Sequence, residues 1–173
     1  PGMTTTVNLP DGSVVHLNSE SKLSYPSFFD KDKRRVTLQG EAFFEVQKDP
    51  EHGFVISTPH ETKIEVLGTS FNVEAFEKDD FVSTTLIEGK VRFDYMKNRQ
   101  STAVLMKPGQ KLTYDSSSSR IQLIETNGES EIAWKDGKVV FHATPLPEAL
   151  RMLEKRFNVT FVLSNERLRS EAF

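Results

Sequence analysis

The sequence predicts a mainly β protein: a wrapped or solenoid-like domain of antiparallel or mixed strands, followed by a partial α+β module. Apolar residues recur at every second position through much of the first 125 residues, as expected for strands that bury one face. Turn-forming residues separate these runs, and the one pronounced helical spacing follows residue 144. These three observations place the strands first and the helix last.

The first two predicted strands form a hairpin. Val7 and Leu9 precede a turn at 10–13, and Val15 and Leu17 follow it. Within that turn, Gly12 can adopt the positive φ that a tight hairpin requires.

The clearest predicted strand covers residues 36–46. Its buried face is expected to hold small and apolar residues at alternate positions: Val36, Leu38, Gly40, Ala42, Phe44 and Val46. Polar residues occupy most positions between them, so one face is expected to be solvated. Phe43 stands on that polar side, which makes it a candidate exposed aromatic residue.

A change of register is predicted in the next run, near Gly68. Ile64 and Val66 occupy even positions, whereas Phe71 and Val73 occupy odd ones. A bulge or corner at Gly68 would exchange the two faces, because glycine tolerates the backbone conformation that such a change needs.

Two further alternating runs follow. The first is expected to place six residues on one face: Thr85, Ile87, Gly89, Val91, Phe93 and Tyr95. The second is expected to place four residues on one face, two before and two after a turn at 107–109: Val104, Met106, Leu112 and Tyr114.

Gly68, Gly89 and Gly109 are separated by 21 and 20 residues. Such a spacing favours a wrapped sheet built from successive rungs. An ordinary sandwich of hairpins remains the alternative, because hairpins also place glycine at regular turns.

The composition changes near residue 130, so we expect one domain over residues 4–130 and a second, truncated module over residues 131–173. Short apolar runs at 139–141 and 159–163 flank a stretch with apolar residues at helical spacing, at about 145–157. Strand, helix and strand in this order predict a βαβ unit with parallel strands.

Several classes of function are disfavoured by composition. A net charge of -3 argues against a dedicated nucleic-acid binder, which needs an excess of basic charge. The chain has no cysteine, and its four histidines lack the spacing of metal ligands. No nucleophile and base can be paired, so we expect no enzyme activity, no metal and no cofactor.

An ordered series of motifs points to a known family. They are Leu9-Pro10-Asp11-Gly12-Ser13; Gly40-Glu41-Ala42-Phe43-Phe44-Glu45-Val46; Leu67-Gly68-Thr69-x-Phe71-Asn72-Val73; Glu88-Gly89-x-Val91; Pro108-Gly109-Gln110; Ala133-Trp134; and Phe157-Asn158-Val159. This series, from about residue 4 to the end, resembles the FecR family of sigma-factor regulators. The motif positions Gly12, Gly40, Gly68, Gly89, Gly109 and Trp134 are expected to maintain the fold and to perform no reaction.

The resemblance implies the periplasmic part of a single-pass inner-membrane protein. Such a protein receives a signal from the signalling domain of a TonB-dependent outer-membrane transducer and passes it to a cytoplasmic extracytoplasmic-function sigma factor. The sigma factor would be reached only through a cytoplasmic segment outside this sequence, and the membrane only through a transmembrane helix outside it. The C-terminal unit resembles the first half of a small secretin/TonB-like module.

We expect the transducer to dock on an exposed sheet edge of the C-terminal unit. The candidate contact residues are Val159, Thr160, Phe161, Val162 and Leu163. The alternative function is a carbohydrate- or ligand-binding β domain, for which an exposed Phe43 would be the first candidate contact.

Overall fold

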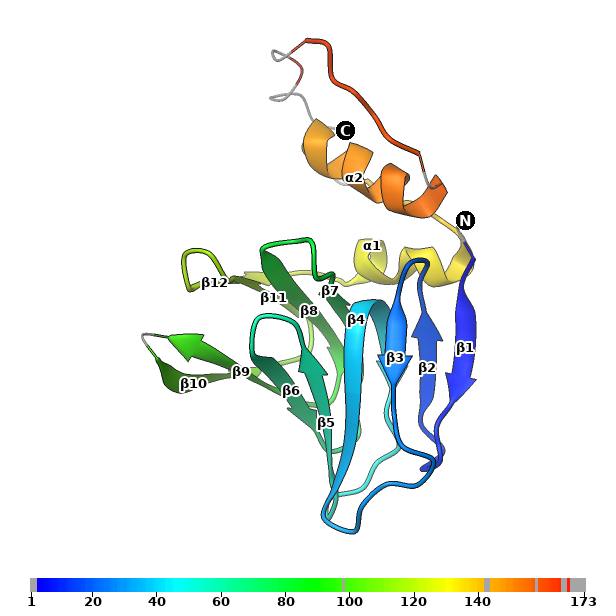
Figure 1. The fold of residues 1–173 in the computed structure, drawn as a ribbon, viewed down its shortest axis with the longest axis vertical. Coiled ribbons are helices and arrows are strands. Elements are labelled where there is room, and N and C mark those ends of the chain that lie inside the picture. The colour runs from blue at the N-terminus through cyan, green and yellow to red at the C-terminus, as the bar shows by residue number, and fades with distance from the viewer. Residues whose placement is uncertain (1–2, 98, 142–143, 158, 166–167, 169–173) are drawn as a thin grey trace.

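The computed structural model describes residues 3–97, 99–141, 144–157, 159–165 and 168. Its main feature is a curled, mixed sheet of 12 strands, which forms a half-barrel with two facing layers (Figure 1). One long strand, β4 (Lys33–Glu45), is hydrogen-bonded in both layers. The mainly β fold predicted from the sequence is therefore confirmed.

The first layer contains the N-terminal part of β4, which pairs in parallel with β5 and antiparallel with β3. Its remaining pairs are antiparallel. Its other members are β3 (Lys22–Ser24), β5 (Gly53–Thr58), β6 (Thr62–Val66), β9 (Val91–Lys97) and β10 (Gln100–Met106).

The second layer contains the C-terminal part of β4, which lies between β2 and β7. All of its strand pairs are antiparallel. Its other members are β1 (Thr5–Asn8), β2 (Val14–Leu17), β7 (Ser70–Ala75), β8 (Phe81–Glu88), β11 (Gln110–Asp115) and β12 (Arg120–Glu125).

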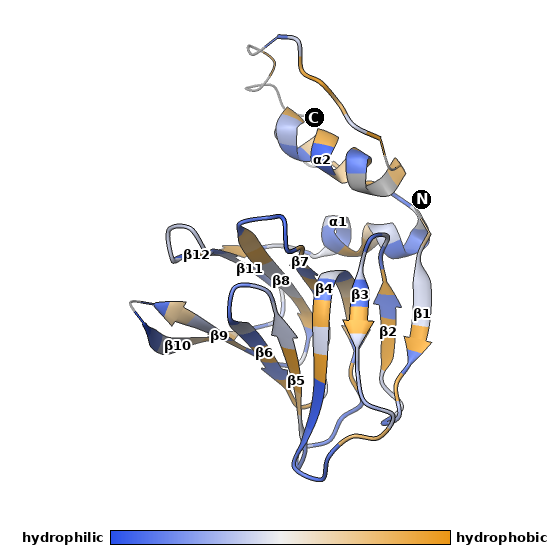
Figure 2. Cartoon of the chain, viewed as in Figure 1, coloured by the Kyte–Doolittle hydropathy of each residue, from blue (hydrophilic) through white to orange (hydrophobic). Residues whose placement is uncertain are grey.

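The passage of β4 between the layers takes place at Gly40, where φ is +110°. A Cβ atom there would lie 2.6 Å from the Cα atom of Ser21, so the two backbones approach too closely for any side chain. Val36 and Leu38 precede this point and Ala42 and Phe44 follow it, and all four are buried in the core. Figure 2 shows the alternation as bands along β4.

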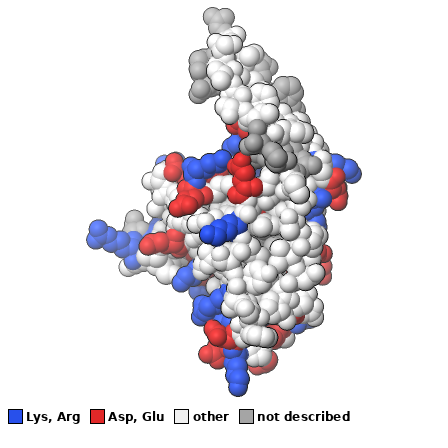
Figure 3. Space-filling model, turned by 45° about the vertical axis from the view of Figure 1, so that its right-hand side comes forward, with Lys and Arg blue, Asp and Glu red and all other residues white. Residues whose placement is uncertain are grey.

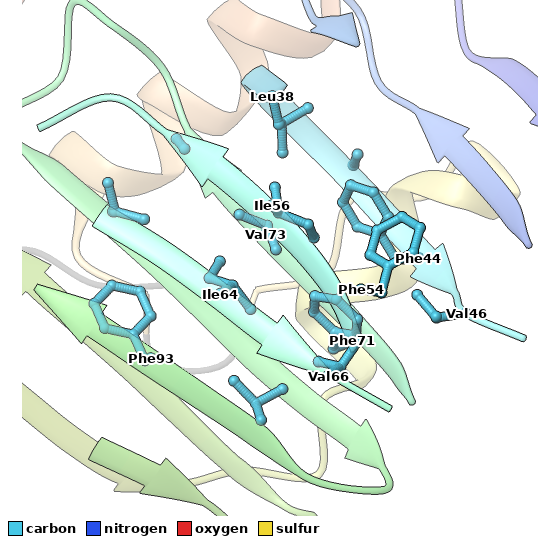
Figure 4. Close-up of a cluster of buried hydrophobic side chains, with 14 of the residues drawn as sticks. Leu38, Phe44, Val46, Phe54, Ile56, Ile64, Val66, Phe71, Val73 and Phe93 are labelled. Atoms are coloured by element: carbon cyan, nitrogen blue, oxygen red, sulfur yellow. The ribbon is translucent and has the colours of Figure 1, made fainter. Parts of the chain in front are cut away.

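Aromatic side chains fill the space between the layers (Figure 4). Phe44 stacks on Phe71 with ring centroids 5.3 Å apart, and it meets Phe54 edge to face at 6.2 Å. Phe93, Tyr95 and Tyr114 pack together farther along the half-barrel. Full burial of each large apolar side chain contributes roughly 1.5–3 kcal/mol, so this cluster is a major source of stability.

Both chain crossings at Gly68 and Gly89 exchange the face that is buried. Gly68 separates β6 in the first layer from β7 in the second, which confirms the predicted change of register. Gly89 separates β8 from β9 in the same manner, and this crossing was not predicted. The core therefore contains Val82 and Leu86 from β8, and the expectation that Thr85 and Ile87 share a face with Val91 is wrong.

Helices follow the last strand: α1 (Glu129–Ile132), the 3-10 helix η1 (Ala133–Asp136) and α2 (Leu146–Phe157). The position of α2 confirms the helix predicted at about 145–157. None of the helices formed by the described residues has the length and apolar character needed to cross a bilayer.

The two strands expected on either side of α2 are not formed. Residues 139–141 and 159–163 have no strand pairing in the structure, so the βαβ unit is wrong in this detail. The backbone N–H of Phe161 instead donates to Oε1 of Glu154 in α2, at 2.7 Å. The segment after α2 therefore lies beside the helix without joining a sheet.

We expect Gly68→Ala to destabilise the protein far more than Gly12→Ala. At Gly68, φ is +145° and a Cβ atom would lie 2.6 Å from the backbone of Lys48, whereas a Cβ atom at Gly12 would meet nothing within 4 Å. The loss for Gly68→Ala should be about 2–4 kcal/mol, since both strain and a clash contribute. The control Gly12→Ala should lose about 1 kcal/mol from the left-handed backbone alone. Urea unfolding measures both losses, and equal losses would contradict the close approach of Gly68 to Lys48.

Candidate functional site

A cleft of about 240 Å³ lies between the outer face of the second layer and the C-terminal helices. The C-terminal helices cover the sheet here, yet the sheet residues that line the cleft are polar. We call these residues the polar floor: Glu41, Asn72, Glu74, Ser83, Thr85 and Lys111. Figure 3 shows acidic and basic side chains gathered below the C-terminal part of the chain.

The strand register explains how these residues meet. Glu41 lies opposite Glu74, which lies opposite Ser83 on the next strand. In the neighbouring row, Asn72 lies opposite Thr85, which lies opposite Lys111. Both rows consist of outward positions on β4, β7, β8 and β11, so antiparallel pairing alone brings together residues that are distant in sequence.

Trp134 in η1 covers one side of the polar floor. Its side chain is 7% exposed, and its Nε1 donates to Oδ1 of Asn72 at 3.3 Å. Val139, Val140 and Pro145 continue this wall, and Met152 of α2 adds to it. The cleft therefore has an apolar wall above a floor of hydrogen-bonding groups.

The carboxylates of Glu41 and Glu74 lie opposite each other on adjacent strands, and each one is stabilised by hydrogen-bond donors. Such a like-charged pair is unfavourable on adjacent strands. Asn18 and Asn72 donate amide hydrogen bonds to the carboxylate of Glu41, at 2.8 and 2.9 Å. Arg151 of α2 donates to Glu74 at 3.0 Å and to Asp79 at 3.2 Å.

Arg151 thus connects α2 to the β domain. Its guanidinium also lies 4.8 Å from the ring centroid of Phe81, at the start of β8. The side chain is 30% exposed, and its partners Glu74 and Asp79 are 17% and 16% exposed. Partial burial makes these ion pairs stronger than those of the open surface.

Glu131 and Lys111 form a second ion pair at the edge of the cleft, with 3.3 Å between Oε1 and Nζ. Burial alone would raise the pKa of Glu131. The Lys111 ammonium and a hydrogen bond from the Ser130 hydroxyl outweigh that effect, so the pKa of Glu131 is lowered.

Phe43, expected to be an exposed aromatic residue, is only 4% exposed. It does face outward from β4, opposite Asn72, as the alternation predicted. However, η1 covers it: Nζ of Lys135 lies 3.7 Å from the ring centroid, and His16 lies beside it at 6.3 Å. The expectation of exposure is therefore wrong, because a later segment of the chain shields this position.

The candidate contact residues of the C-terminal unit lie at the surface. Val159, Phe161 and Val162 are 45%, 43% and 86% exposed, and Thr160 is also exposed. Leu163 is partly buried. The motif glycines Gly12, Gly40, Gly68, Gly89 and Gly109 all have positive φ, and none of them lines the cleft.

Sequence reasoning missed the polar floor itself. Asn72 and Ser83 alternate with core residues and look like ordinary solvated positions, whereas Thr85 was assigned to the same face as Val91. Only the three-dimensional cover reveals these three outward residues as buried. Among the described residues, no group of three or more histidine, aspartate or glutamate side chains is placed to hold a metal ion.

Comparisons with known proteins agree on one family. Residues 1–92 match the family described as FecR protein, and residues 138–173 match the family described as FecR, C-terminal. No curated protein matches the chain.

Two crystal structures are similar over most of the chain, each of a candidate anti-sigma factor from Parabacteroides distasonis ATCC 8503. The first has a TM-score of 0.89 and 30% identity, and the match covers 99% of this chain and 79% of the other. The second has a TM-score of 0.82 and 32% identity, with coverage of 91% and 71%.

We expect Arg151→Gln to lower the free energy of unfolding by about 1–3 kcal/mol, because it removes the positive charge that pairs with the partly buried carboxylates of Glu74 and Asp79. The matched control is Arg92→Gln, since Arg92 pairs with Asp94 on the open surface and is 53% exposed. This control should change stability little. Urea unfolding followed by circular dichroism compares the two, and an equally small loss for both variants would contradict a role of Arg151 in docking α2.

The lowered pKa of Glu131 predicts a loss of stability in acid. A carboxyl whose pKa is lower in the folded state stabilises the fold above its unfolded pKa, and this contribution disappears as the pH falls through the folded pKa. Melting temperatures measured downward from neutral pH should therefore decline less steeply below pH 4.5, the ordinary value, in Glu131→Gln than in the wild type. Glu129→Gln, an exposed change in the same helix, is the control; identical curves for Glu131→Gln and the wild type would refute the assignment.

Proposed function

Because the chain belongs to the FecR family, we propose that it is the signal-receiving part of a transmembrane anti-sigma regulator. The family match and the similar anti-sigma structures support a regulator of this class. The finer proposal is that the chain lies in the periplasm and binds the signalling domain of a TonB-dependent outer-membrane transducer. A cytoplasmic segment outside this sequence would then act on an extracytoplasmic-function sigma factor.

The observation that carries the proposal is the pair of family matches, one on the β domain and one on the C-terminal unit, in the expected order. The family is generally non-enzymatic, which agrees with a binding role. The earlier alternative of a β domain that binds a ligand through Phe43 loses its main support, since Phe43 is covered by Lys135.

We place the transducer on the C-terminal unit, at the end of α2 and the segment that follows. Phe157 is 59% exposed, and exposed apolar residues continue through Val159, Phe161 and Val162. A run of exposed apolar side chains within a short segment is typical of protein contact sites. The segment 159–163 is also free of strand pairing, so a partner strand could add to its backbone.

We expect Val162→Asp to weaken binding of the transducer's signalling domain at least about tenfold, since a buried charge would replace an apolar contact. Val162 is 86% exposed, so the substitution should leave stability unchanged. Leu105→Asp is the matched control, because Leu105 is 76% exposed on the edge strand β10 of the β domain. Isothermal titration calorimetry with the signalling domain of a TonB-dependent transducer from the same organism measures the affinities.

Two results would count against the proposal in different ways. A loss of binding in Leu105→Asp, with Val162→Asp unaffected, would move the contact to the β domain. The absence of binding by the wild-type chain would refute the transducer as its partner.

A further inference from the structure

Two hydroxyl groups on the floor open onto the cleft. Ser83 and Thr85 are 5% and 2% exposed, both line the cleft, and neither side chain makes a hydrogen bond among the described residues. Neither oxygen is among the fully enclosed polar atoms that lack a partner, so both can be reached from the cleft. Hydroxyls of this kind bond either to water in the cleft or to a ligand that displaces the water. A molecule bound in the cleft would therefore find two free hydrogen-bonding groups on its floor.

The charges of the cleft nearly balance. Four carboxylates line it, from Glu41, Glu74, Glu131 and Glu148, against three cations, from Lys111, Lys138 and Arg151. Arg151 is paired with Glu74, and Lys111 with Glu131. A phosphate or another strongly anionic ligand would meet four carboxylates, and a bare cation would meet three positive groups. The balance favours a ligand without net charge.

The volume of the cleft and its apolar wall narrow the class of ligand further. The cleft of about 240 Å³ is smaller than the ~300–1,000 Å³ typical of drug-sized ligands, so it suits a single ring. Trp134, Val140 and Met152 offer apolar surface, whereas Ser83, Thr85 and the carboxylate oxygens offer hydrogen-bonding groups. A sugar ring has C–H groups on its faces and hydroxyls around its edge, and it matches this division.

We propose that the cleft binds a neutral monosaccharide, whose hydroxyls bond to Ser83 and Thr85 and whose ring lies against the apolar wall at Trp134. This site is distinct from the surface proposed for the transducer. It lies between the β domain and α2, so a bound sugar would contact both parts of the chain.

The one tryptophan of the sequence provides the measurement, since Trp134 lines the cleft. A fluorescence titration of the 173-residue chain with a panel of neutral hexoses and pentoses should show a saturable change for at least one sugar. Thr85→Val keeps the shape of the side chain and should weaken that binding about tenfold, as the loss of one hydrogen bond predicts. Ser83→Ala should act in the same direction.

The control is Thr113→Val, which removes a hydroxyl from the same cross-strand row as Ser83 but outside the cleft. It should leave the sugar affinity unchanged, and circular dichroism confirms the fold of each variant. No saturable change with any sugar would overturn the proposal, as would binding that Thr85→Val and Ser83→Ala leave intact. A response to acetate or inorganic phosphate in place of sugars would refute the neutral class. Transducer binding is measured separately, so neither result decides the other.

Discussion

The hydrogen bonding of β4 in both layers is the constraint on which the rest of the structure depends. Residues before Gly40 pair with β5, and residues after it pair with β7. The close approach of Gly40 to Ser21 fixes the point at which the strand changes layers. Once that point is set, Phe44 must face the core and Glu41 must face outward. The core and the candidate site are therefore two faces of the same strand.

The outward face of β4 also determines how the C-terminal unit is held. Glu41 lies opposite Glu74 on β7, and this unfavourable pair is compensated by amides on one side and by Arg151 on the other. The helix α2 thus supplies a positive charge to this face of the β domain. The two regions of the chain are coupled through partly buried electrostatics, and a partner that binds near the end of α2 would act on a helix already attached to the sheet.

Much of the fold could be predicted from local patterns, and most of the site could not. The alternation along β4, the change of face at Gly68 and the helix α2 are local, and they are confirmed. The crossing at Gly89 was missed, because alternation does not reveal which layer a strand joins. Phe43 was assigned to the correct face of its strand. Its burial could not be predicted, because Lys135, which covers it, comes from a distant segment. The contact between Arg151 and Glu74 spans 77 residues, and no local pattern indicates it.

In the proposed function, the signal enters through the C-terminal unit, and the β domain is the body to which that unit is attached. Hydrogen exchange of the chain, measured with and without the transducer's signalling domain, tests this claim most directly. The account predicts slower exchange across residues 146–163 in the complex, and unchanged exchange in the edge strands β10 and β12. Slower exchange confined to β10 or β12, with residues 146–163 unchanged, would contradict it.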